Sequence, residues 1–371
     1  MARDDNAVHR RTRWAWQKHN AALISVILFS VILISVLLAA PVNAWERLRD
    51  DAPERYTVEA GDTLWDIAAR FLHAPWQWPE LWRENPQIEN PHRIYPGDKL
   101  TLRDCQGMPC IQLERGTHVV KLSPVVRTLP HREAIEPLPR EAVEAFLRQH
   151  RIVDNAEALN TLAYVVAGDD QRLISGAGDR IYVRLTDQTR DESTMVRGEP
   201  MGLYRQGEPY VGADGDVLGI ELVSVGEAVL MRREGDIAQL EVRRAEFEVR
   251  NDDIVLPLEL PFADDPFMPR APRNQVSGSI LAVPGGVRFI GRLQVVVVDL
   301  GTQDGLQPGH VLRVDQQGER VNDPRTQEVL QLPAEAAGAL MIFKPYDHVS
   351  YALVVEASRV LAVGDRVRTP R

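Results

Sequence analysis

Hydrophobic residues dominate one long run near the start of the chain. Residues 21–40 read AALISVILFSVILISVLLAA, with no charge and nothing more polar than serine. A helix of 20 residues rises about 30 Å, which is enough to cross the hydrocarbon core of a bilayer. A helix packed in a soluble core would carry a polar face, and this run has none. The pattern therefore predicts a membrane-crossing helix or the apolar region of a signal peptide.

The residues around this run indicate export. Five basic residues precede it: Arg3, Arg10, Arg11, Arg13 and Lys18. A basic flank stays in the cytoplasm, so everything after the run is expected to be exported. Pro41 would end a helix, and Val42 and Ala44 are small residues at the two positions that a signal peptidase reads. The run is longer than the usual signal-peptide core, so residues 1–44 are interpreted as either a cleaved signal peptide or a retained membrane anchor.

A strand, a tight turn and a helix are predicted next. Residues 56–58 (YTV) favour a strand, and residues 60–62 (AGD) favour a turn. Thr63 suits the N-cap of a helix, and Asp66 three positions later completes a capping box. Apolar residues then recur at the i, i+3, i+4 and i+7 positions of one helical stripe: Leu64, Ile67, Ala68 and Phe71.

A second helix and a second strand complete this unit. Pro79 suits the first position of a helix with the sequence PELWREN, which must end before Pro86. The turn YPGD at residues 95–98 leads into a closing strand over residues 99–102. The pattern therefore predicts a small α+β unit with the order strand, helix, helix, strand.

Two motifs mark the ends of this unit. The start reads YTVEAGDTLWDIAARF, which contains V-x-x-G-D-T-L-W-x-I-A, and the end reads NPQIENPHRIYPGDKLTL, which contains I-x-P-G-x-x-L. Together they resemble a LysM domain, the lysin-motif module of cell-wall proteins. The resemblance covers residues 55–103. The insert HAPWQWPELW is longer than in the shortest family members and is similar to the variant common in proteobacterial envelope proteins.

The resemblance implies binding of glycans that contain N-acetylglucosamine, such as peptidoglycan. In the family, the groove lies between the turn before the first helix and the segment between the second helix and second strand. Its first wall would be formed by Gly61, Asp62, Thr63 and Leu64. Its second wall would be formed by Asn85, Pro86, Gln87 and Ile88. Main-chain groups would pair with acetamido groups and apolar side chains would cover the sugar faces, so no charge is required.

Several of these residues also have a purely structural interpretation. Asp62 and Thr63 can cap the helix, and such a role does not exclude ligand contact. Among the tryptophans, Trp65 and Trp82 are expected to lie in the core. Trp76 and Trp78, which are flanked by prolines, are expected to form a partly exposed platform for sugar rings.

Residues 104–163 are expected to connect this unit to the rest of the chain. Cys105 and Cys110 flank a glycine and a proline in CQGMPC, and in an oxidising compartment this pair is expected to form a disulfide. The alternative is a redox or metal site, but the spacing is not Cys-x-x-Cys. A proline-rich connector follows, and short helices are predicted over residues 141–149 and 156–160, the second capped by Asp154.

From residue 163 onward, short β-branched runs alternate with Gly and Asp turns, which is typical of barrels or sandwiches. A faint internal repeat pairs Asp252 with Asp365 and Pro257 with Pro370, both 113 positions apart. We therefore expect two β-rich domains, at residues 164–257 and 278–370, joined by a proline-rich linker at 258–277. The alternative is one larger β-domain whose halves look alike.

Charge and composition limit the function classes. The chain of 371 residues has 43 basic and 53 acidic residues, a net charge of −10, and a hydrophobic content of 44% that is normal for folded domains. Nucleic acid requires a basic face, so it is not an expected partner.

No catalytic motif emerges from the sequence. The nine histidines form no H-x-H or H-E-x-x-H pattern, and neither S-x-x-K nor G-x-S-x-G occurs. Acidic pairs such as Asp252-Asp253 fall at turns, where solvated surface is the ordinary explanation. We therefore expect no enzyme, no cofactor and no metal. The alternative is a cell-wall remodelling hydrolase whose active site lies in the tail.

The sequence thus predicts a multi-domain α+β protein: a leader, a βααβ LysM domain and a β-rich tail of two barrel-like or sandwich-like domains. The expected function is non-catalytic peptidoglycan binding in the periplasm, either as a secreted protein or as one anchored in the inner membrane. The tail would serve as a platform for other envelope proteins. This arrangement also resembles a group of proteobacterial LysM-containing proteins.

Overall fold

The computed structural model describes residues 47–82, 94–105, 108–114, 140–186, 197–258, 268–285, 289–318 and 320–370. The chain divides into two units, residues 1–48 and 49–371, and the account below concerns the second. The leader predicted at residues 1–44 lies outside the described residues. Within the described ranges, no helix has the length and hydrophobicity needed to cross a membrane.

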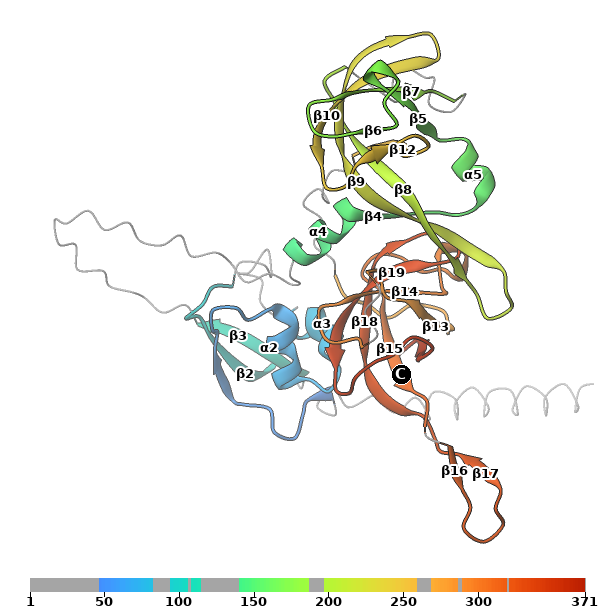
Figure 1. Ribbon diagram of the computed structural model, residues 1–371. Coiled ribbons are helices and arrows are strands. Elements are labelled where there is room, and N and C mark those ends of the chain that lie inside the picture. Colours follow the sequence, from blue (N-terminus) through green and yellow to red (C-terminus); the bar gives the residue numbers. More distant parts are fainter. Residues whose placement is uncertain are drawn as a thin grey trace, which may run out of the picture. The chain divides into compact units, whose positions relative to one another are not determined.

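The first module is built on a three-stranded antiparallel sheet with the order β1-β2-β3 (Figure 1). Its elements are β1 (Arg55–Thr57), α2 (Leu64–Phe71), η2 (Pro75–Gln77), α3 (Trp78–Trp82), β2 (Lys99–Cys105) and β3 (Met108–Glu114). The predicted order of strand, helix, helix and strand is confirmed. Strand β2 is longer than expected, and β3 is an additional strand that the sequence pattern did not indicate. The predicted disulfide is present and joins Cys105 of β2 to Cys110 of β3.

Helix α2 carries the predicted apolar stripe into the core of this module. Its stripe residues are all buried: Leu64, Ile67, Ala68 and Phe71. Ile94 and Leu100, which flank the turn before β2, are also fully buried. Burial of one stripe on a two-turn helix is what holds so short a helix in place, because its own hydrogen bonds are too few to do so.

The tryptophans correct part of the sequence interpretation. Trp65 and Trp82 are buried, as expected. Trp78 is only 4% exposed, so the prediction that it forms an exposed sugar platform is wrong. It begins α3 and turns inward, and Pro79 therefore occupies the second helical position rather than the first. Trp76 is partly buried.

The connector contributes one helix, one strand and a short helix to the β-rich region. Helix α4 (Arg140–Gln149) agrees with the prediction, and β4 (His150–Val153) follows it directly. Strand β4 pairs with β9 (Val217–Glu234), so the end of the connector extends a sheet. The short helix α5 (Ala156–Asn160) is capped by Asn155, whose side chain accepts from the N–H of Ala158, and not by Asp154 as predicted.

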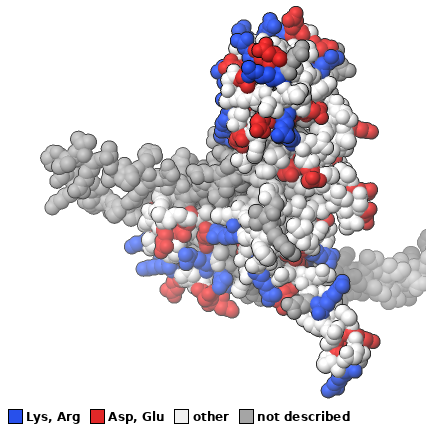
Figure 2. Space-filling model, in the orientation of Figure 1, with Lys and Arg blue, Asp and Glu red and all other residues white. Residues whose placement is uncertain are grey.

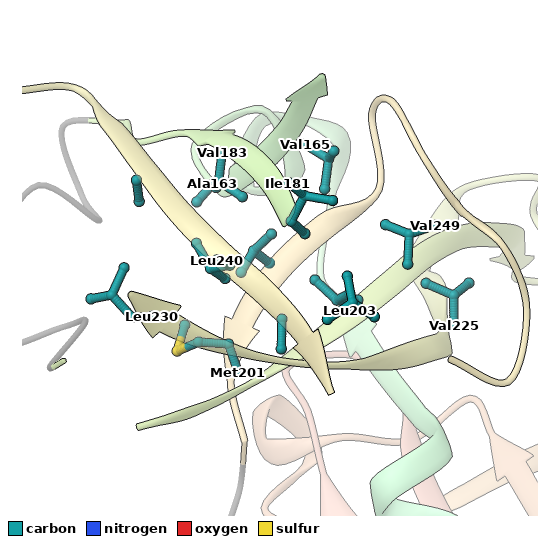
Figure 3. Packing of buried hydrophobic residues seen from close by; sticks show 14 of the residues in the cluster. Ala163, Val165, Ile181, Val183, Met201, Leu203, Val225, Leu230, Leu240 and Val249 are labelled. Atoms are coloured by element: carbon teal, nitrogen blue, oxygen red, sulfur yellow. The ribbon is translucent and has the colours of Figure 1, made fainter. Parts of the chain in front are cut away.

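The first barrel consists of six antiparallel strands that form a closed ring. They are β5 (Ala163–Gly168), β7 (Arg180–Arg184), β8 (Pro200–Val211), β9, β10 (Ile237–Ala245) and β12 (Ile254–Pro257). Their order around the ring is β5-β7-β10-β9-β8-β12, because β10 pairs with β9 as well as with β7. Alternate residues of each strand fill the interior, among them Ile181, Leu203 and Leu240 (Figure 3). A small ladder of β6 (Ile174–Ser175) and β11 (Val249–Arg250) lies beside the ring.

The second barrel has the same topology. Its strands are β13 (Ser277–Ala282), β14 (Val295–Val298), β15 (Val311–Gln316), β18 (Glu335–Pro345), β19 (Ser350–Ala357) and β20 (Arg366–Arg368). Their order is β13-β14-β19-β18-β15-β20, so each strand has a counterpart at the same place in the first ring. The internal repeat therefore corresponds to two similar six-stranded barrels and not to one larger domain. Between β15 and β18, a hairpin of β16 (Arg320–Asn322) and β17 (Val329–Gln331) projects from the second barrel (Figure 1).

The structure changes one of the predicted residue pairs between the two barrels, the aspartate pair, by one position. Asp253 accepts a hydrogen bond from the N–H of Arg250 at 2.7 Å, and Asp365 accepts one from the N–H of Ala362 at 2.8 Å. Each aspartate immediately precedes the last strand of its barrel. The residue before each has a positive φ, +74° at Asp252 and +94° at Gly364. The pair of Asp252 with Asp365 is therefore wrong, and Asp253 is the counterpart of Asp365.

Candidate functional site

The turn before α2 brings together the predicted first wall of the groove. Gly61 has a φ of +94°, a conformation that side chains with a Cβ rarely adopt. A Cβ placed on Gly61 would meet nothing within 4 Å, so one side of this turn is open. Glycine is needed here for the backbone conformation and not to avoid a clash.

Asp62 is held by the turn. Its Oδ2 accepts from the hydroxyl of Tyr56 at 2.7 Å and from the N–H of Glu59 at 2.8 Å. Burial, together with the bond to Asp62, raises the pKa of Tyr56 to about 12, so the hydroxyl keeps its proton at neutral pH. Arg70 of α2 lies over the ring of Tyr56 at 4.5 Å from the centroid. Tyr56 was not singled out from the sequence, because its partner lies six positions away across a turn.

Thr63 and Asp66 form the predicted capping box. The N–H of Asp66 donates to Thr63 Oγ1 at 3.1 Å, and the N–H of Thr63 donates to Asp66 Oδ2 at 3.2 Å. The hydroxyl of Thr63 also donates to Asp66 Oδ2, at 2.7 Å. Leu64, the fourth residue of the predicted wall, is buried in the module. The side chains of three of these four residues therefore serve the fold.

What the turn offers a ligand is its main chain. Gly61 is exposed, and Asp62 and Thr63 are partly exposed. Leu64 and Trp65, the first two residues of α2, are only 2% and 3% exposed, so their N–H groups are covered by the module. The exposed main chain at Gly61 is therefore the part of this turn that an uncharged acetamido group could contact.

The predicted second wall falls outside the described residues. Asn85, Pro86, Gln87 and Ile88 belong to the stretch 83–93, for which the structure gives no placement. The turn that follows is described. The N–H of Gly97 donates to Val58 O at 2.8 Å, and the N–H of Val58 donates to Asp98 O at 2.9 Å. These bonds join the segment before β2 to the residue that follows β1.

Thr63→Ala is expected to destabilise the first module by about 1 kcal/mol, because the N-cap oxygen that accepts from Asp66 is lost. Thr63→Ser keeps that oxygen and is the matched control. All seven tryptophans lie before residue 83, so urea unfolding followed by tryptophan fluorescence reports on this region. Equal unfolding midpoints for the two variants would show that the cap does not stabilise the helix.

In the part of the chain that the structure describes, no group of His, Cys, Asp and Glu residues is arranged to hold a metal ion. Basic and acidic side chains are interspersed over the face shown in Figure 2. The site near Gly61 is thus defined by main-chain groups and shape.

Comparison with known proteins agrees with the motifs at both ends of the first module. Residues 56–103 match the family model of the LysM domain. A relative from Bacillus subtilis (strain 168), named "Uncharacterized protein YqbP", is 37% identical over 67 residues, an alignment that covers 15% of this chain. The alignment covers 31% of the relative, so the chain spans less than a third of that protein's length. Residues 56–103 of this chain therefore form a LysM domain.

Proposed function

We propose that the protein binds the glycan strands of peptidoglycan through its LysM domain, without catalysing a reaction on them. The observation that carries this proposal is the match of residues 56–103 to the LysM domain, a glycan-binding module. The open turn at Gly61 supports it. The second wall, Asn85 to Ile88, is proposed from the resemblance alone.

A neutral sugar suits this site. Asp62 and Asp66, the two carboxylates of the turn, both accept hydrogen bonds within the module. Recognition would rest on main-chain donors for acetamido oxygens and on apolar contacts with sugar faces. We expect binding of peptide-free glycan strands to be nearly independent of salt, because no ion pair with the sugar is involved.

The remainder of the chain suggests how the LysM domain is used. We propose that residues 1–44 export the chain or anchor it in the inner membrane, with the body in the periplasm of a proteobacterial cell. Anchoring would raise the local concentration near the wall and compensate for the weak affinity of one small module. The two barrels would present a platform for envelope proteins. The projecting β16–β17 hairpin, with Val329 65% exposed, is a suitable contact.

Two matched glycine variants test the proposed groove. Gly61→Asn places a side chain on the proposed first wall, whereas Gly97→Asn makes the same change in a turn outside it. Both glycines have nearly the same φ, +94° and +93°, and a Cβ at either position would meet no atom within 4 Å. Asn tolerates positive φ better than most residues, so both variants should fold with the same small loss of stability.

Binding to purified sacculi is the measurement. We expect Gly61→Asn to sediment several-fold less protein with sacculi than wild type, and Gly97→Asn to sediment as wild type does. Equal binding by the two variants would remove Gly61 from the site. In the same incubation, release of soluble muropeptides by the wild-type chain would contradict the non-catalytic part of the proposal and support the hydrolase alternative.

A further inference from the structure

A concave site lies on the C-terminal barrel, where the chain enters β13 and β15. This pocket has a volume of about 440 Å³. Its polar lining consists of Arg270, Arg273, Asn274, Asp304, Gln307 and His310. None of these residues belongs to the LysM domain, and the first three fall in the stretch that the sequence pattern assigns to a linker.

This stretch is fixed to the barrel at both ends. The N–H of Arg270 donates to Gly309 O at 3.0 Å, and the N–H of Val311 donates to Arg270 O at 2.8 Å. A Cβ on Gly309 would lie 2.6 Å from Met268 O, so glycine permits this close approach. Further on, the hydroxyl of Thr369 donates to Asn274 O at 3.0 Å. Residues 268–274, which belong to the expected linker, are therefore hydrogen-bonded to the barrel.

The pocket presents several hydrogen-bond donors. The guanidinium of Arg270 is oriented by Gln307, to whose Oε1 it donates at 2.8 Å. His310 is only 4% exposed, and its Nδ1 accepts from the N–H of Gln307 at 3.2 Å. Nε2 therefore carries the proton of the neutral ring, and no acceptor for it exists among the described residues. Burial, followed by the charge of Arg270, lowers the pKa of His310, so the ring stays neutral near pH 7.

Charge limits the kind of ligand. Arg273 makes no ion pair within the described part of the chain, so its positive charge adds to that of Arg270. Asp304 offsets one of these charges, and one of its oxygens accepts from the N–H of Gly301 at 2.8 Å. The net charge of the lining is thus close to that of one cation. It matches a single carboxylate better than a doubly charged phosphate, and the other oxygen of Asp304 can accept from an N–H of the ligand.

We propose that this pocket binds a short peptide through one of its free carboxylates, held by Arg270, Arg273 and the Nε2–H of His310. The identification of this peptide as a peptidoglycan stem rests on the proposed function. Peptidoglycan carries short peptide stems with free carboxylates, and these branch from the glycan that the LysM domain would hold. The barrel would then contact the stem while the LysM domain contacts the sugar, and each contact would strengthen the other.

The test uses the full chain and the peptide released from sacculi by an N-acetylmuramoyl-L-alanine amidase. Binding is measured by isothermal titration calorimetry for wild type, for Arg270→Gln/Arg273→Gln, and for Arg320→Gln/Arg325→Gln. The last pair removes the same charge from the β16–β17 hairpin and its turn. We expect the first double variant to bind about 10-fold more weakly, since charge-assisted hydrogen bonds are lost, and the control to bind as wild type does.

Three further probes separate the possible outcomes. The methyl-esterified peptide, which has no free carboxylate, is expected not to bind. Inorganic phosphate that binds while the peptide does not would overturn the proposal, as would equal binding by the two double variants. Peptide-free glycan strands test the LysM domain separately. If they fail to bind while the peptide binds to the pocket, the proposed function fails and the inference about the pocket stands.

Discussion

Replacing Phe71 with Ala is expected to abolish retention of the protein on sacculi while both barrels stay folded. Phe71 is fully buried at the end of α2, in the core of the LysM domain. Truncation of a buried Phe to Ala costs about 3–5 kcal/mol. A domain of about 50 residues has little more stability than this, so the LysM domain should unfold. The barrels have cores of their own and should not follow.

Two spectroscopic signals distinguish unfolding of the LysM domain from unfolding of the barrels. Tryptophan fluorescence reports on the LysM domain, because four of the seven tryptophans lie within residues 56–103 and none lies in either barrel. Far-ultraviolet circular dichroism is dominated by the barrels. The matched control is Phe247→Ala, which makes the same chemical change at a side chain that is 58% exposed. Full retention of Phe71→Ala on sacculi, with an unfolded LysM signal, would place the wall contact elsewhere in the chain.

Asp253→Ala is expected to destabilise the first barrel by about 3 kcal/mol. Asp253 is buried and accepts two hydrogen bonds from the guanidinium of Arg205, at 2.9 Å and 2.8 Å. Removal of the carboxylate leaves that charge without its partner and also frees the N–H of Arg250. Hydrogen exchange of peptides from β8 and β12 should show faster opening. Unchanged exchange there would mean that the ion pair does not stabilise the barrel.

Its counterpart in the second barrel should behave differently. Burial raises the pKa of Asp365 above its usual value, with a smaller opposing effect from the N–H of Ala362. The folded state therefore binds this proton more tightly than the unfolded state does. The contribution of Asp365 to stability is greatest below the usual carboxyl pKa and is lost as the pH rises through the raised pKa. Asp365→Asn keeps an acceptor for Ala362 and should remove this pH dependence without loss of stability at pH 7.

Local periodicity explains what the sequence predicts well. The stripe from Leu64 to Phe71, the cap at Thr63 and the turn at Gly61 depend on residues within a few positions of each other. The structure places all of them as expected. The disulfide between Cys105 and Cys110 is equally local.

Long-range pairing explains what the sequence does not predict. Strand β3 exists because residues 108–114 pair with β2, and β4 exists because it pairs with β9 some 70 positions away. The one-residue error in the repeat arose because Asp252 and Asp253 are adjacent and identical, and only their hydrogen bonds distinguish them. The proline-rich composition of residues 268–274 likewise gave no sign that they bond to the barrel. Gly309, which accepts from the N–H of Arg270, lies far along the chain.

The most direct test of the account is binding of the intact protein to immobilised glycan strands from which an amidase has removed the peptide stems. We predict that the strands retain the protein and that an excess of N-acetylglucosamine oligomers releases it. Recovery of all the protein in the unbound fraction, while tryptophan fluorescence shows a folded LysM domain, would contradict glycan binding by residues 56–103.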